Sequence, residues 1–116
     1  MNNELKHDIK RKLLDLGVVP SNLGFNYLTE AIYDFMTQTG ESKYSWLKLY
    51  DRIAQLNNSA GTRVERAIRH SIELAFDQPN TVLLKMFKSF MPETGIAKVA
   101  NSTFISTVAT HIEIGE

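Results

Sequence analysis

The chain has 116 residues, of which 43% are hydrophobic and 22% are charged, as expected of a soluble globular domain with a single core. It contains no cysteine, which excludes a disulfide framework, a thiolate metal site and a cysteine nucleophile. Its 13 basic and 13 acidic residues give a net charge of zero, which excludes a uniformly basic chain but is compatible with a basic face on a neutral one.

The N-terminal residues carry scattered charges and lack the apolar stretch of a signal peptide. No run elsewhere is long and apolar enough to span a bilayer. We therefore expect one domain over residues 1–116, located in the cytoplasm and without a membrane partner.

Apolar residues recur at helical spacing through the first third of the chain. Residues 3–16 carry one apolar stripe, and Gly17 suits the position just after a helix end. An extended link is predicted over residues 18–20, because the residue before a proline avoids the helical conformation. The second helix is predicted to begin near Ser21 or Asn22 and to end at about residue 39.

Helical spacing continues to the C-terminus. A third helix is predicted to begin at Ser42 or Ser45, a fourth runs over residues 62–76, and a fifth covers about residues 81–89. A last helix is predicted to be capped by Asn101 or Ser102. Because the sequence shows no clear alternating strand pattern and no internal repeat, we predict an all-α fold of about six helices.

The predicted fourth helix has two different faces at about 100° per residue. Its apolar side carries Val64, Ala67, Ile68, Ser71, Ile72 and Ala75. Its polar side carries Thr62, Arg66, Arg69, His70 and Glu73. Such a helix packs one face on a core and exposes the other to solvent.

The residues before the fourth helix predict a tight turn between two helices. Residues 57–61 supply turn and cap chemistry. Ala54 allows the two helices to cross closely, and Val64 fills the angle between them, which is the layout of a helix-turn-helix over about residues 45–77. Many such motifs have glycine in the turn, where this chain has Asn58, a residue type that tolerates the left-handed conformation. A plain helical hairpin has the same pattern.

Basic side chains gather in and beside this motif. They are Lys43, Lys48, Arg52, Arg63, Arg66, Arg69 and His70. A basic face on a neutral protein is compatible with DNA binding, although a helix face that serves only solubility shows the same pattern.

The sequence offers little support for enzyme chemistry. His7, His70 and His111 lie on three different predicted helices without ligand spacing, and no metalloprotease, phosphate-loop or EF-hand motif is present. Carboxylate pairs such as Asp8 and Asp15 are far more often solvated helix faces than acid–base pairs. We therefore expect no enzyme activity, no metal and no cofactor.

The run RVERAIRHSIELAF, residues 63–76, resembles the recognition helix of the DNA-binding effector domain of the stage zero sporulation response regulator, a sporulation master transcription factor. The likeness extends to residues 16–18 and 24–32 on one side and to residues 101–109 on the other. The resemblance therefore covers nearly the whole chain.

This resemblance implies an all-helical effector domain that binds short promoter elements in double-stranded DNA and regulates transcription. The contact residues it implies are Arg63, Glu65, Arg66, Arg69 and His70, with Ser59, Gly61 and Thr62 at the helix N-terminus and Lys98 before the last helix. We expect Arg66 to read guanine through O6 and N7, and Glu65 to read cytosine through N4. Ser59, Gly61 and Thr62 are expected to contact phosphate.

The resemblance also bears on partners. The sigma subunit of RNA polymerase is a candidate partner, although residues 89–100 depart from the family's pattern. We expect a monomer in solution that pairs on tandem DNA sites, because no heptad seam is long enough for a coiled coil.

The family's phosphoacceptor receiver domain is not part of these 116 residues, so the chain is expected to be a stand-alone relative or a piece of a longer regulator, and to bind DNA without phosphorylation. The alternative function is a protein-interaction module, or a decoy that pairs with a full-length regulator or with the transcription machinery.

Overall fold

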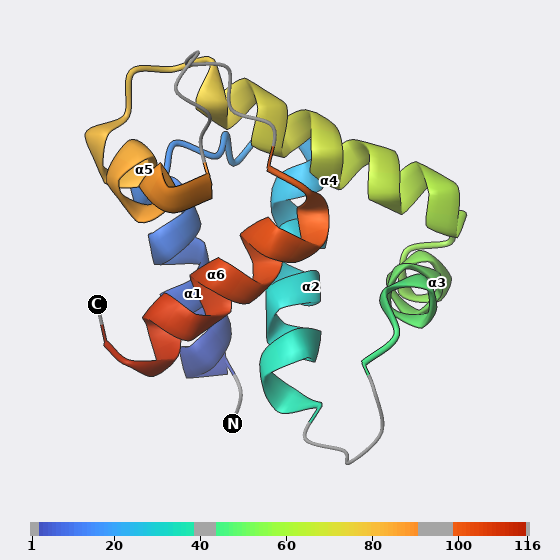
Figure 1. Cartoon of the computed structure of the whole chain (residues 1–116). Coiled ribbons are helices and arrows are strands. Elements are labelled where there is room, and N and C mark those ends of the chain that lie inside the picture. Colours follow the sequence, from blue (N-terminus) through green and yellow to red (C-terminus); the bar gives the residue numbers. More distant parts are fainter. Residues whose placement is uncertain (1–2, 39–43, 91–98, 116) are drawn as a thin grey trace.

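The computed structural model describes residues 3–38, 44–90 and 99–115. Every regular element in those residues is helical (Figure 1). The elements are α1 (Asn3–Asp15), α2 (Leu23–Thr37), α3 (Trp46–Leu56), α4 (Gly61–Phe76), α5 (Thr81–Met86), the 3-10 turn η1 (Lys88–Phe90) and α6 (Asn101–Glu113). The all-α prediction of about six helices is confirmed. Within the described ranges, none of these helices has the length and apolar character needed to cross a bilayer.

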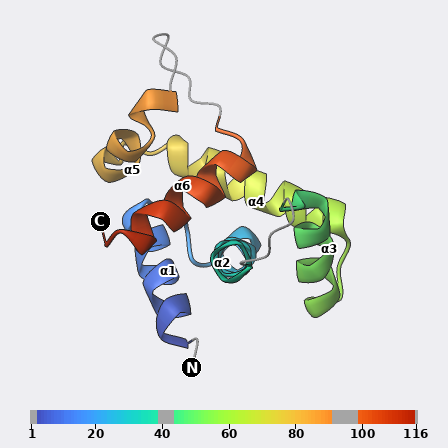
Figure 2. The ribbon, with the colours of Figure 1, turned by 60° about the horizontal axis from the view of Figure 1, so that its bottom comes forward.

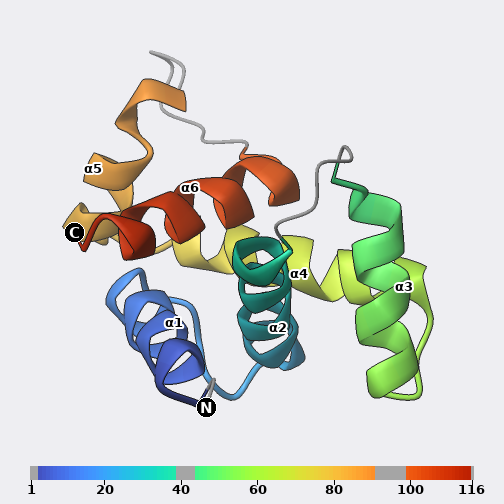
Figure 3. The same ribbon diagram turned by 90° about the horizontal axis from the view of Figure 1, so that it is seen from below.

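Helix α2 stands at the centre of the molecule. Helices α1, α3, α4 and α6 all pack against it; Figure 2 looks nearly along its axis, and Figure 3 shows it between α1 and α3. A helix with neighbours on several sides needs apolar residues around most of its circumference. Accordingly, α2 buries Phe25, Tyr27, Leu28, Ala31 and Ile32.

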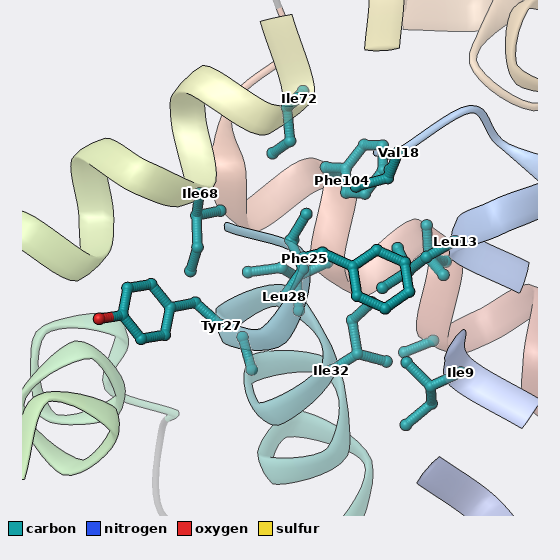
Figure 4. Packing of buried hydrophobic residues seen from close by; sticks show 14 of the residues in the cluster. Ile9, Leu13, Val18, Phe25, Tyr27, Leu28, Ile32, Ile68, Ile72 and Phe104 are labelled. Carbon is teal, nitrogen blue, oxygen red and sulfur yellow. The ribbon is translucent and has the colours of Figure 1, made fainter. Parts of the chain in front are cut away.

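The core forms around this central helix (Figure 4). Leu13 from α1, Ile68 and Ile72 from α4 and Phe104 from α6 join Leu28 in one buried cluster. Each fully buried side chain of this kind contributes about 1.5–3 kcal/mol relative to its exposed state. Helix α4 is therefore fixed by its apolar face, which leaves its opposite face toward solvent.

Helices α2 and α4 approach each other closely at Gly24. A Cβ atom added there would lie 2.0 Å from Ser71 Oγ and 2.4 Å from the carbonyl oxygen of Ala67. Only glycine allows two backbones to come this near. The Ser71 hydroxyl is buried and has no hydrogen-bond partner among the described residues.

Helix α3 is held to α2 by a polar and aromatic cluster. Asp34 of α2 accepts a hydrogen bond from the Tyr44 hydroxyl at 2.6 Å and two from the Arg52 guanidinium at 2.6 and 3.0 Å. The rings of Phe35 and Trp46 stack with centroids 5.4 Å apart, and Tyr44 packs edge-on against both. This group of five residues, the Asp34 cluster, attaches the first helix of the predicted motif to the core.

Several predicted helix ends agree with the structure. Gly17 follows α1 with a φ of +84°, and Asn22 is the N-cap of α2 although its side chain makes no capping hydrogen bond. Ser45 is the N-cap of α3, and its hydroxyl accepts from the Lys48 amide at 3.3 Å. Ser42, the other predicted start, lies outside the described residues.

Two predicted details differ from the structure. The fifth helix, predicted over about residues 81–89, ends at Met86 and is followed by the separate turn η1. Asn101 does not cap α6: Ala100 is the N-cap, and the Asn101 side-chain amide instead donates to the Glu65 carbonyl of α4 at 3.1 Å. A buried amide requires a partner, and here α4 provides the acceptor.

Candidate nucleic-acid interface

The turn between α3 and α4 is a Schellman turn. Asn58 has a φ of +52°, and the Ser59 amide donates to the Ala54 carbonyl at 2.8 Å, the hydrogen bond that defines this helix end. The Asn57 side chain also donates to the Ile53 carbonyl at 2.8 Å. Asn58 thus adopts the left-handed conformation that its residue type tolerates, and this conformation fixes the angle at which α4 leaves α3.

The first turn of α4 combines free backbone donors with a nearby carboxylate. Its N-cap, Ala60, has no side chain that can accept from the first amides, which leaves them available to an anion. A Cβ atom at Gly61 would lie 2.4 Å from the Asp51 Oδ1 atom. Asp51 of α3 therefore stands beside the helix end where a phosphate is expected.

The outward face of α4 carries the unpaired cations. Thr62, Arg63, Arg66 and His70 are exposed, whereas Val64 and the residues that share its face are buried. Within the described part of the chain, the side chains of Arg63 and Arg66 have neither an ion-pair nor a hydrogen-bond partner. Their guanidinium groups are thus available to a ligand.

Glu65 and Arg69 lie on the flank of α4 that faces α6. Arg69 donates to both Glu65 carboxylate oxygens, at 3.0 and 2.8 Å. The Asn101 amide donates to the Glu65 carbonyl at 3.1 Å and approaches its Oε2 atom at 3.4 Å. The two predicted contact residues therefore bind each other, and a residue of α6 holds one of them.

Tyr50 of α3 borders the same flank. Burial raises the pKa of Tyr50, the Asn101 side chain lowers it through a hydrogen bond, and the Glu65 charge raises it. Tyr50, Glu65, Arg69 and Asn101 line an open hollow of about 390 Å³ between α3, α4 and the start of α6. The neutral tyrosine thus forms part of the wall against which the Glu65–Arg69 pair lies.

The remaining predicted cations are placed differently. Arg52 is paired with Asp34 at 2.6 Å, and this hydrogen-bonded carboxylate raises the pKa of Arg52. The positive charge of Arg52 is therefore paired within the Asp34 cluster. Lys48 is exposed on α3. Lys43 and Lys98 lie outside the described residues.

Ser59, one of the predicted phosphate contacts, faces inward. Its hydroxyl is buried without a hydrogen-bond partner among the described residues, and its amide is used in the turn. Gly61 and Thr62, by contrast, form the first turn of α4, where Thr62 is exposed. The structure thus brings Thr62, Arg63, Arg66 and His70 onto one outward face.

Comparison with protein families identifies the chain. The family model described as "Sporulation initiation factor Spo0A C terminal" matches residues 9–112, from the middle of α1 to the last turn of α6. The chain belongs to this family. It is therefore a DNA-binding effector domain, in agreement with the resemblance of its fourth helix, and the outward face of α4 is its candidate DNA-reading surface.

Three residues beside the candidate reading surface of this domain could not be assigned from the sequence. Asn101 and Tyr50 reach the Glu65–Arg69 pair from α6 and α3, and Asp51 reaches the start of α4. Asn101 was predicted as a helix cap because asparagine favours that position. No local sequence pattern distinguishes an asparagine that caps its own helix from one that, like Asn101, binds a residue 36 positions earlier on another helix.

Proposed function

We propose that this domain is a sequence-specific transcription regulator that inserts α4 into the major groove of double-stranded DNA. The supporting observation is that Arg63 and Arg66 are exposed on the outward face of α4 and have no partner in the described residues. The major groove is wide enough for one α-helix, and arginine is the side chain that most often reads guanine there.

The proposed roles follow from position. Arg66 lies centrally on the outward face of α4 and is assigned to guanine; Arg63 and His70 flank it and are assigned to bases or phosphates. The amides of Gly61 and Thr62 are assigned to a phosphate at the helix N-terminus. Glu65 is assigned to cytosine while it remains paired with Arg69. Ser59 is assigned an indirect role, as part of the turn that orients α4.

The test begins with selection of preferred duplexes from a random pool, followed by titration of labelled duplexes. Arg66→Ala should lower affinity for the selected site by about 1–3 kcal/mol and relax the preference at one base pair. The matched control is Lys48→Ala, which removes one exposed charge from α3 and should weaken all sequences alike. Equal losses on selected and random DNA for both variants would contradict base readout by Arg66.

We further propose that the domain is a monomer in solution and pairs on tandem sites. Among the described residues, exposed large apolar side chains are spread over separate elements, for example Leu47 on α3, Val82 on α5 and Ile114 after α6. Light scattering without DNA should give the mass of one chain. A tight dimer at micromolar concentration that buries α4 would contradict this proposal.

The protein-interaction alternative makes the opposite prediction for DNA. A decoy has no need of unpaired arginines on α4, which favours the DNA reader. Capture of a full-length regulator or of the RNA polymerase sigma subunit by a chain that prefers no duplex over another would support the alternative.

Lys98 is proposed as a phosphate contact, and Lys98→Ala should then weaken binding to all DNA sequences evenly.

A further inference from the structure

Asn101 is a buried polar residue in the first turn of α6. Only 8% of its surface is exposed, so its amide needs partners within the protein. The donor reaches the Glu65 carbonyl at 3.1 Å and the Glu65 Oε2 atom at 3.4 Å. One side chain of α6 therefore contacts both the backbone and the carboxylate of a residue on the reading helix.

The contact continues from Glu65 to Arg69. The guanidinium of Arg69 donates to both oxygens of the same carboxylate, at 3.0 and 2.8 Å. Among the described residues, Glu65 Oε2 thus interacts with two donors, whereas Oε1 accepts a hydrogen bond from Arg69 alone. Because each carboxylate oxygen has about two acceptor positions, Oε1 retains room for a donor from DNA while the pair stays intact.

From this geometry we infer that Asn101 is a positioning residue for DNA recognition. It holds the Glu65 carboxylate, and through it the Arg69 guanidinium, in one orientation before DNA arrives. Exposed glutamate and arginine side chains otherwise lose substantial rotamer freedom when they bind, and a contact that fixes them beforehand reduces this loss. Asn101 thereby sets the discrimination at the base pair that Glu65 reads. This inference rests on the proposed function.

The test compares Asn101→Leu with Thr103→Ala, a control in the same turn of α6 that leaves the Asn101 contacts in place. First, Glu65→Ala identifies the base pair at which Glu65 discriminates. Asn101→Leu should then reduce discrimination at that base pair about three- to tenfold, while affinity for random duplex stays at the wild-type value. Thr103→Ala should change neither quantity.

A double-mutant cycle separates positioning from general destabilisation. If Asn101 acts through Glu65, Asn101→Leu should have no further effect on discrimination in the Glu65→Ala background. Asn101→Asp serves as a second variant if the leucine variant does not fold, because it keeps the size, removes the donor and repels the Glu65 carboxylate. It should lose discrimination at the same base pair.

The outcomes are distinguishable. A wild-type domain that prefers no duplex over another overturns the proposed function and this inference with it. A wild-type domain with a clear preference that Asn101→Leu and Asn101→Asp both retain overturns only the inference. Equal losses on all duplexes, in step with a lowered melting temperature, also overturn it, because they indicate a purely structural role for Asn101.

Discussion

Pairing between side chains decides how much positive charge α4 offers to DNA. Arg69 is bound to Glu65, and Arg52 is bound to Asp34. Arg63 and Arg66 remain unpaired in the described residues. Since each phosphate neutralised by a cation adds to the salt dependence of binding, we expect a smaller salt dependence than the number of basic residues near the motif would indicate.

Asp51 affects this interface through its position beside the first turn of α4. A carboxylate there stabilises the helix N-terminus by about 0.3–1 kcal/mol but repels an incoming phosphate. Asp51→Asn should therefore tighten binding to every duplex about two- to fivefold at low salt and slightly lower the melting temperature. Fluorescence anisotropy at two salt concentrations measures the change.

Asp77→Asn provides the control with the same change in net charge. Asp77 is the C-cap of the 16-residue helix α4, about 24 Å from the N-terminus at 1.5 Å per residue. That separation exceeds the Debye length of about 10 Å at 0.1 M salt. Equal tightening by the two variants would show that net charge, rather than the position of Asp51, is responsible.

Tyr44 should make the folding stability of the domain decrease at alkaline pH. Burial and the hydrogen bond to Asp34 raise the pKa of Tyr44 above its ordinary value of 10.0. The stability from this raised pKa is fully present below pH 10.0, the unfolded value, and is lost as the pH rises through the folded value. Tyr44→Phe, which keeps the ring packing, should reduce stability at neutral pH and show a shallower decline above pH 10. Urea unfolding from pH 8 upward measures both, and parallel pH curves for the two proteins would contradict the prediction.

At the scale of the helices, the crossing of α2 and α4 sets the distance of α4 from the core. Gly24→Ala should destabilise the domain by about 1–3 kcal/mol through overpacking, because the backbone oxygen of Ala67 lies 2.4 Å from the added Cβ atom. Ser71→Ala removes a buried hydroxyl without a partner in the described residues and should be neutral or stabilising. Urea unfolding gives both values.

The double variant provides a sharper test of this crossing. Ser71→Ala in the Gly24→Ala background removes the clash with the Ser71 hydroxyl but leaves the Ala67 carbonyl oxygen at 2.4 Å and the Cβ atom of residue 71 at 2.8 Å. Only part of the lost stability should return. Full recovery would show that the close approach depends on the serine hydroxyl and not on the two backbones.

The helices of this domain were predictable from sequence because each has a clear apolar face and recognisable ends. The turn at Asn58 was predictable as well, since few residues other than glycine accept a positive φ. The break between α5 and η1 was not, because short apolar runs carry little periodicity. The Asn101–Glu65 contact was not predictable either, since it depends on how α6 lies across α4.

At the scale of the whole molecule, α3 is the peripheral helix of the motif. It packs on α2 and α4 and lies at one side of the molecule in Figures 1 and 3. Much of its attachment to α2 comes from the Asp34 cluster, in which one half-buried carboxylate accepts three hydrogen bonds.

Asp34→Ala should therefore loosen α3 selectively. Amide hydrogen exchange is expected to accelerate in α3 and in the turn after it, while α1 and α6 keep the protection of the wild-type domain. The control is Glu30→Ala, which removes the ion pair with Lys6 on the α1 side of α2. Uniformly faster exchange in all helices of the Asp34 variant would contradict a local role.

The close approach at Gly24 also limits how the domain can be dissected. Helix α4 packs on α2, α3 and α6, and two of these three partners, α2 and α6, lie outside residues 45–77. A peptide of those residues would expose Ile68 and Ile72, which pack in the core with residues of α2 and α6, and short isolated helices are marginal in water. The proposed DNA-reading motif thus depends on the rest of the domain for its fold. A transplanted motif should show random-coil circular dichroism unless Gly24 and the rest of α2 are included.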